Sequence, residues 1–157
     1  MKTTIKKWAF VFACLIATGL MAQDKMAFNI DNSNIALDGY SPVSYLDLGL
    51  AQRGSKEFKS EYNKVVFYFT SQQQKEKFNK NPERYLPQYG GYCAFGIYAG
   101  AKFRTDPNKF IVRDDKYYLF LYNVELDAQQ LWLDEKDDDK LIKKADENWK
   151  KLRSSYN

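Results

Sequence analysis

Two stretches rich in β-branched and aromatic residues constrain the fold of this chain most strongly. "KEFKSEYNKVVFYFTS" (56–71) has such residues on both sides of Asn63, and "FIVRDDKYYLFLY" (110–122) has Asp114 and Asp115 at its centre. These residue types favour strands, and Asn or Asp between two such runs favours a tight turn. The sequence therefore predicts two antiparallel β-hairpins. The second arm of the first, 65–70, is apolar at almost every position, which predicts burial on both faces.

Short helices are expected around the hairpins. Ser41 can cap a helix, Pro42 suits its first position and Gly49 suits its exit, which predicts a helix over 42–48. Ser71 is expected to cap "QQQKEKFNKN", and Pro82 to open a helical turn that runs to residue 86. The glycine-rich stretch that follows is expected to be irregular.

Two further helices are predicted at the C-terminal end, one over about 124–133 and one after "DDD". The acidic run "LDEKDDDK" lacks the glycine and the distal glutamate of a calcium loop, so Asp137–Asp139 are interpreted as a helix start. The chain shows no internal repeat. These patterns predict an α+β fold, a small antiparallel sheet of two hairpins with short helices and two C-terminal helices.

The first 22 residues have the features of an export signal. Lys2, Lys6 and Lys7 precede an apolar run, which is too short to span a bilayer comfortably and ends before Ala22. We expect cleavage after Ala22, a linker or edge strand over 23–34, and one domain over 35–157, periplasmic or extracellular and without a membrane span. Cys14 is not expected to carry a lipid, because Phe12 is bulky beside the cut and almost no apolar run precedes it.

Charge and histidine content exclude several functions. The first 22 residues hold three of the 24 basic residues and none of the 20 acidic ones, so the rest of the chain carries +1. A near-neutral, mixed surface predicts no nucleic-acid partner. The chain has no histidine, which removes the usual zinc ligand and the usual general base.

Cys93 in "QYGGYCAFG" (88–96) is the sharpest candidate for chemistry. It is the only thiol after the expected cleavage site, and neighbouring backbone N–H groups could lower its pKa. The alternative is a small buried residue in a tight crossing of the chain. Tyr89 and Tyr92 could form an aromatic ligand platform. Asp38 and Tyr40, in "DGYSPVSY", stand beside a helix start and could position a polar ligand.

Two long motifs resemble a known family. "DGYSPVSY" (38–45) and "EYNKVVFYFTSQQQKEKFNKNPERYLPQYGGYCA" (61–94) resemble the YHS domain, and the chain after residue 22 resembles the secreted, single-domain branch of that family. The resemblance implies a small α+β domain with a treble-clef-like core, often associated with heavy-metal handling through cysteines.

The ligand set departs from the family pattern. The metal-binding members carry cysteines at the positions of Ser44, Thr70 and Gln74, and the Tyr-His-Ser triplet falls at residues 61–63 without a histidine. Soft metals need thiolate, thioether or imidazole donors. Cys93 belongs to the "YGGYCA" signature of the secreted branch.

Three functions follow as hypotheses. The first is a non-enzymatic binding module for a small molecule or an envelope protein, with Tyr89, Tyr92, Cys93, Asp38 and Tyr40 as ligand-binding residues and no cofactor. An aromatic face that only docks a partner is a variant of it. The second is copper handling through Cys93, alone, across a dimer or with a partner's ligands. The third is an enzyme with Cys93 as nucleophile or redox thiol.

Overall fold

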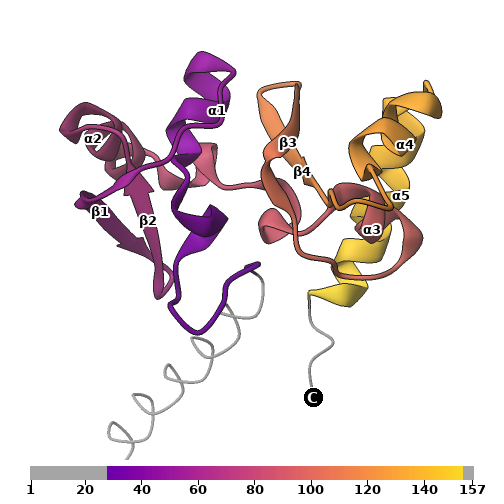
Figure 1. Cartoon of the computed structure of the whole chain (residues 1–157), viewed down its shortest axis with the longest axis horizontal. Helices are drawn as coiled ribbons and strands as arrows, with labels where there is room; N and C mark the ends of the chain where they lie inside the picture. Colours follow the sequence, from indigo (N-terminus) through magenta and orange to yellow (C-terminus); the bar gives the residue numbers. More distant parts are fainter. Residues whose placement is uncertain (1–27, 154–157) are drawn as a thin grey trace, which may run out of the picture.

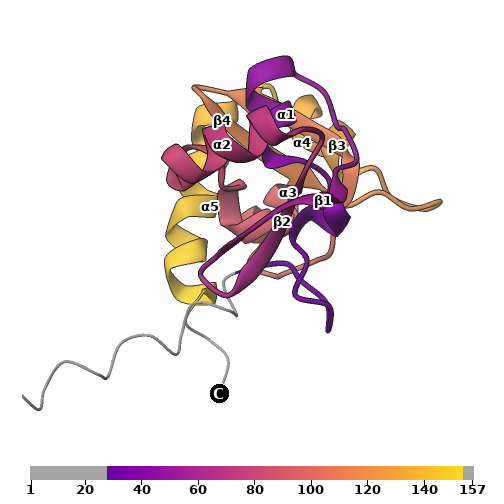
Figure 2. The same ribbon diagram turned by 90° about the vertical axis from the view of Figure 1, so that its left-hand side faces the viewer.

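The chain folds into two halves that lie side by side (Figure 1). The computed structural model describes residues 28–153, so the expected signal peptide and the first part of the expected linker lie outside the described residues. Figure 2, turned to view the first half, shows its helices and hairpin in front of the second half.

Each half consists of a short 3-10 turn, a helix, a hairpin and further helical segments. The first half contains η2 (Ala36–Gly39), α1 (Pro42–Leu48), β1 (Ser55–Tyr62), β2 (Val65–Phe69), α2 (Gln72–Lys80) and η3 (Pro82–Tyr85). The second half contains η4 (Gln88–Gly91), α3 (Ala94–Ala99), β3 (Asp106–Arg113), β4 (Lys116–Phe120), α4 (Ala128–Asp134) and α5 (Asp138–Leu152).

The predicted α+β class and both predicted hairpins are confirmed, and so is a long C-terminal helix. The prediction of one sheet is wrong, because within residues 28–153 β1 pairs only with β2 and β3 only with β4. Each hairpin also has an isolated bridge to an earlier segment of its own half, from Val66 to Ile35 and from Leu119 to Cys93. The two hairpins belong to different halves, so no strand of one can extend the other.

Two helix predictions need correction. The helix expected from residue 124 begins at Ala128, because Asn123 Oδ1 accepts the N–H groups of residues 125 and 126 and forms a turn there. Asp127 then caps α4 by accepting the Gln130 N–H group at 3.1 Å. The stretch expected to be irregular contains α3, which ends at Gly100 in the left-handed conformation.

The two halves repeat one backbone pattern that the sequence analysis did not detect. Residues 37–39 have φ angles of 57°, 50° and 83°, and residues 89–91 have φ angles of 53°, 62° and 85°. A helix begins three residues after each turn, α1 at Pro42 and α3 at Ala94, and each helix ends at a left-handed glycine. The turn and the helix start therefore recur 52 residues later.

The hairpins repeat the pattern as well. Each has an eight-residue strand, a two-residue turn and a five-residue strand, and each register shifts within the first four residues, after Ser55 in β1 and after Asp106 in β3. Both turns have two consecutive positive φ angles, at 63–64 and at 114–115, as in a type I′ turn. The expectation of no internal repeat is therefore wrong for the backbone.

Strand β4 is buried on both faces and separates two hydrophobic cores. Its alternation places Tyr117 and Leu119 in the core of the first half and Tyr118 and Phe120 in the core of the second half. Two-sided burial was predicted for residues 65–70, but β2 alternates between buried and half-buried positions. The hairpin of the second half thus supplies the strand that both halves share.

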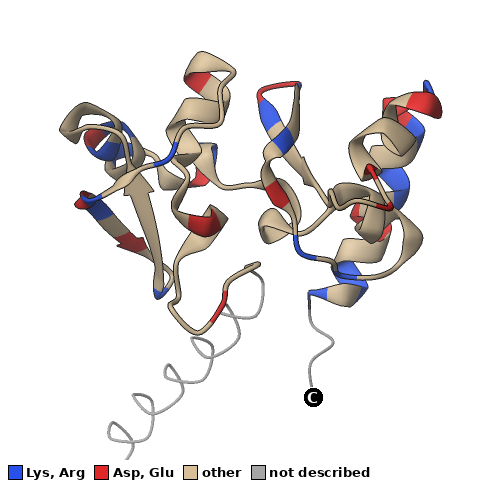
Figure 3. Ribbon diagram, viewed as in Figure 1, with Lys and Arg blue, Asp and Glu red and all other residues tan. Residues whose placement is uncertain are grey.

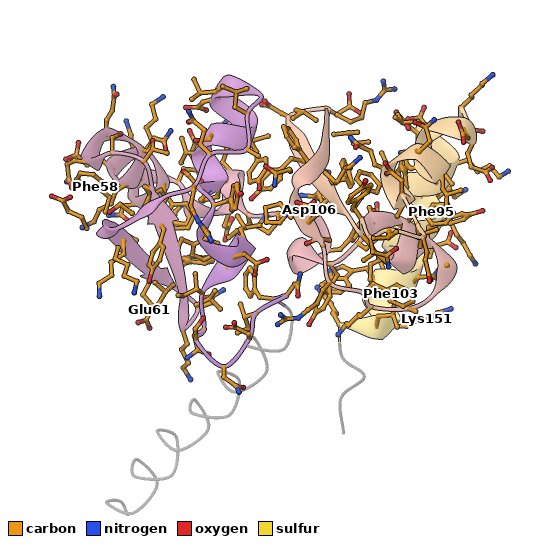
Figure 4. The ribbon with its side chains drawn as sticks, in the orientation of Figure 1. Phe58, Glu61, Phe95, Phe103, Asp106 and Lys151 are labelled. Carbon is orange, nitrogen blue, oxygen red and sulfur yellow. The ribbon has the colours of Figure 1, made fainter. Side chains whose placement is uncertain are left out.

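A buried pair of tyrosines fastens α1 to this strand. The rings of Tyr45 and Tyr117 stack with centroids 4.7 Å apart. The Tyr45 hydroxyl donates to the Pro107 carbonyl at 2.8 Å, and the Tyr117 hydroxyl donates to the Tyr85 carbonyl at 2.9 Å. Burial raises the pKa of both phenols, so they remain donors. Figure 4 shows the neighbouring Asp106 at this junction, with Phe58 and Phe95 at opposite ends of the molecule.

The surface of the described residues carries mixed charge. Lys and Arg are interspersed with Asp and Glu over both halves in Figure 3. Among residues 28–153, no helix has the length and apolar character needed to cross a membrane.

Gly54 is predicted to be essential for the close approach of the chain to β2. A Cβ atom at Gly54 would lie 2.6 Å from the Tyr68 carbonyl carbon, whereas a Cβ atom at Gly49 would meet nothing within 4 Å. Gly54→Ala is expected to lower the free energy of unfolding by about 3 kcal/mol, measured by urea denaturation. The control Gly49→Ala is expected to cost about 1 kcal/mol, for the left-handed φ alone. Equal losses would contradict the clash.

Candidate functional site

Cys93 is a packing residue at the start of α3. Its side chain is 1% exposed, and its Sγ accepts the Gly96 N–H group at 3.4 Å as the helix cap. Burial raises the pKa of the thiol, and this effect outweighs the backbone N–H groups that lower it. The backbone donors foreseen from the sequence are present, but desolvation dominates. The thiol is therefore protonated and shielded at neutral pH.

The two tyrosines of the glycine-rich stretch have intramolecular partners. Tyr89 is 4% exposed and donates its hydroxyl to Asp146 at 3.1 Å. Tyr92 is half-buried and donates to the Phe28 carbonyl at 3.2 Å. The Lys102 ammonium lies 5.3 Å from the centroid of the Tyr92 ring. Both side chains thus hold the chain together.

The N-terminal segment contacts the glycine-rich turn directly. The Asn29 N–H group donates to the Gly90 carbonyl at 2.8 Å, and the Asn29 carboxamide donates to the Gly91 carbonyl at 3.1 Å and to Thr105 Oγ1 at 3.2 Å. Phe28 is buried in the first core. Residues 28–34, expected to form a linker or an edge strand, are therefore partly packed against the second half.

An open pocket lies at the corresponding turn of the first half. Its volume is about 450 Å³, and η2, β1, β2 and the N-terminal segment line it with Asp31, Ser33, Ile35, Asp38, Gly39, Arg53, Gly54, Lys56 and Tyr68. The Arg53 guanidinium donates to the Asp38 carbonyl at 3.2 Å and lies 5.4 Å from the centroid of the Tyr40 ring. Two carboxylates and two cations surround this opening, so it can offer charges of both signs to a ligand.

The predicted site residues therefore divide between the halves. Asp38 lines the pocket and Tyr40 supports Arg53 beside it, whereas Tyr89, Tyr92 and Cys93 surround the second turn. By the repeat, Tyr40 corresponds to Tyr92. The sequence analysis named residues at both turns. The structure places them at two equivalent positions of the repeat rather than in one shared site.

Of the pocket residues, sequence reasoning named only Asp38, and it missed the charged and aromatic side chains of Arg53, Lys56 and Tyr68. They come from the segment before β1, from β1 and from β2, and pairing of the hairpin brings them to the turn. The one available signal is Gly54 beside Arg53, since an isolated glycine near a strand suggests a close backbone approach.

A buried polar network lies beneath α1. The Ser41 hydroxyl donates to Gln74 Oε1 at 2.6 Å, and Gln74 Nε2 donates to Ser44 Oγ at 3.0 Å. Gln74 Oε1 also accepts the Thr70 N–H group at 3.2 Å, and Ser44 donates to Gln52 at 2.8 Å. Ser41 was expected as a side-chain cap of α1, but its hydroxyl serves this network instead.

The network joins three residues that were examined from the sequence as possible metal-ligand positions. Ser44, Thr70 and Gln74 are far apart in sequence and adjacent in the structure. Their hydroxyl and carboxamide groups do not suit a soft metal ion. Among residues 28–153, no cluster of three or more His, Cys, Asp or Glu residues could hold a metal ion.

Comparison of the chain with family models, with curated proteins and with solved structures found no match.

Gln74 is predicted to hold the buried network together. Gln74→Met would leave the Ser41 hydroxyl and the Thr70 N–H group without their acceptor, at an expected cost of about 3 kcal/mol in the free energy of unfolding. The exposed neighbour Gln73 is the control, and Gln73→Met is expected to change stability by less than about 0.5 kcal/mol. Similar urea midpoints for the two variants would contradict this role.

Cys93 is predicted to react slowly with alkylating reagents. In a Cys14→Ser background, with Cys93 as the only thiol, iodoacetamide at neutral pH is expected to modify the folded protein about 100-fold more slowly than the urea-unfolded chain. The reason is its burial and its raised pKa. Equal rates in the two states would show an accessible thiol and revive the thiol-based hypotheses.

Proposed function

We propose that this protein is an exported, non-enzymatic binding module with a YHS-type, treble-clef-like core, and that its ligand site is the pocket of the first half. The observation that carries the proposal is this 450 Å³ opening beside a rigid left-handed turn. Its volume lies in the range of small-ligand sites. The ligand is a polar molecule or a short polypeptide segment that presents hydrogen-bonding groups and charge to Asp38 and Lys56.

The convergence of Ser44, Thr70 and Gln74 supports the family part of the proposal. Positions that the YHS motif places together at a metal site are hydrogen-bonded to one another here. In this chain a satisfied polar network stands where the family places its metal ligands. A buried network of this kind fixes the local structure without supplying chemistry.

The state of Cys93 argues against copper handling and thiol catalysis. A nucleophile or a Cu(I) ligand acts as thiolate, and burial raises the pKa of this thiol. The two side chains proposed to share a site with it have other partners, Tyr89 with Asp146 and Tyr92 with Phe28. A binding role at the other turn needs none of these groups.

Ligand-induced stabilisation tests the proposal. We expect at least one class in a panel of amino acids, short peptides, monosaccharides, nucleosides and dicarboxylic acids to raise the unfolding temperature. A ligand at 100 times its Kd adds about 2.7 kcal/mol, which corresponds to roughly 5 to 10 °C for a chain of this size.

Two charge reversals on β1 localise the effect. Lys56 lines the pocket and Lys59 does not; both are exposed on the same strand. Lys56→Glu is expected to abolish the thermal shift, and the matched control Lys59→Glu to preserve it. A panel without any stabilising compound, or a shift that survives Lys56→Glu, would contradict the proposed site.

A further inference from the structure

The internal repeat allows the open pocket to be compared with an occupied counterpart in the same molecule. Along the repeat, Asp38 and Gly39 correspond to Gly90 and Gly91, 52 residues later. In the hairpin, where Ser55 corresponds to Asp106, Gly54 corresponds to Thr105, 51 residues later. Positions 38, 39 and 54 all line the pocket. Their counterparts in the second half are the three residues that accept the hydrogen bonds of Asn29.

The occupant of the second half is a short piece of the chain's own polypeptide, bent at Asn29 by a hydrogen bond from the Ile30 N–H group to the Phe28 carbonyl at 3.0 Å. Its main chain donates from Asn29 to the Gly90 carbonyl, and its carboxamide donates to the Gly91 carbonyl and to Thr105. The Tyr92 hydroxyl donates a hydrogen bond to the carbonyl of Phe28, the residue before Asn29. A left-handed turn of this kind presents successive carbonyl oxygens to one side, so it can receive a main-chain N–H group and a side-chain amide together.

The first half has the same carbonyls and a removable group in front of them. The Asp38 carbonyl, the counterpart of the Gly90 carbonyl, accepts from the exposed Arg53 guanidinium at 3.2 Å. The Gly39 carbonyl accepts the Gly54 N–H group at 2.8 Å, and a carbonyl oxygen has two lone pairs. Arg53 thus occupies the place that the Asn29 N–H group takes in the second half.

We propose that the pocket of the first half binds a short segment of another polypeptide that carries an asparagine-like carboxamide. The main-chain N–H group of that residue donates to the Asp38 carbonyl after Arg53 moves aside, and its carboxamide donates to the Gly39 carbonyl. Lys56 and Asp31 at the rim contact the flanking residues. This inference rests on the proposed function, because it names the ligand class of the same pocket.

A peptide that copies the chain's own occupant is the direct probe. A blocked pentapeptide with the sequence of residues 27–31, Ala-Phe-Asn-Ile-Asp, is titrated into ¹⁵N-labelled protein and followed by NMR. The amide signals of Gly39, Gly54 and Tyr68 are expected to shift and saturate. The same peptide with Asn29→Ala is expected to bind about tenfold more weakly, because the hydrogen bond from the carboxamide to the Gly39 carbonyl is lost.

Arg53→Ala in the protein is expected to change the affinity for the peptide in the opposite direction. Removal of the guanidinium frees the Asp38 carbonyl, so the peptide is expected to bind about fivefold more tightly. Lys59→Ala, which removes another exposed cation outside the pocket, is the control and is expected to leave the affinity unchanged. An affinity that falls with Arg53→Ala would overturn the proposed displacement and with it the inference.

Three other outcomes would also overturn it. Shifts at Gly90, Gly91 and Thr105 instead of Gly39 and Gly54 would show that the peptide only replaces the chain's own segment. A second outcome is that a panel compound raises the unfolding temperature in a Lys56-dependent way while the peptide does not shift the Gly39 amide signal. This result would refute the polypeptide ligand but support the proposed binding module. If neither the panel nor the peptide binds, the inference and the proposed function fail together.

Discussion

The structure depends on one strand that is buried on both faces. β4 sends Tyr117 and Leu119 into one core and Tyr118 and Phe120 into the other, so each half completes its interior with residues of the same five-residue segment. The Tyr45–Tyr117 stack then fixes α1 against this strand, and two phenol hydroxyls satisfy backbone carbonyls at the junction. Because both cores share β4, the two left-handed turns are held in a fixed relation to one another.

The two halves share one backbone pattern, but different groups donate hydrogen bonds to the carbonyl oxygens of their left-handed turns. Each turn has three consecutive positive φ angles and is followed by a capped helix and a bulged hairpin. In the second half the turn is covered by Asn29, which makes it part of the scaffold. In the first half the exposed Arg53 side chain donates to the corresponding carbonyl. The turn of the second half is thus part of the scaffold, whereas the turn of the first half borders an open pocket.

Polar side chains beneath α1 form a hydrogen-bonded network rather than a reactive site. Ser41, Ser44, Thr70 and Gln74 satisfy one another's hydrogen-bonding groups in a partly buried place, and such a network specifies one arrangement of α1 and α2. Cys93 takes the position of Ser41 in the repeat, and it caps α3 with its sulfur instead of joining a network. The equivalent side chains are thus both buried at a helix start, and neither is exposed for reaction.

The sequence by itself determined the α+β class, both hairpins, helix α1 and the capped start of α5, because strand propensity, turn residues and helix caps are local. It also drew attention to Asp38, Tyr40, Tyr89, Tyr92 and Cys93. Tertiary structure alone decided that these residues lie at two equivalent turns, that β4 rather than β2 is buried on both sides, and that Arg53, Lys56 and Tyr68 line the pocket. The physical reason is that backbone conformation can repeat with almost no repeated side chains, and burial and partners arise only from contacts between distant segments.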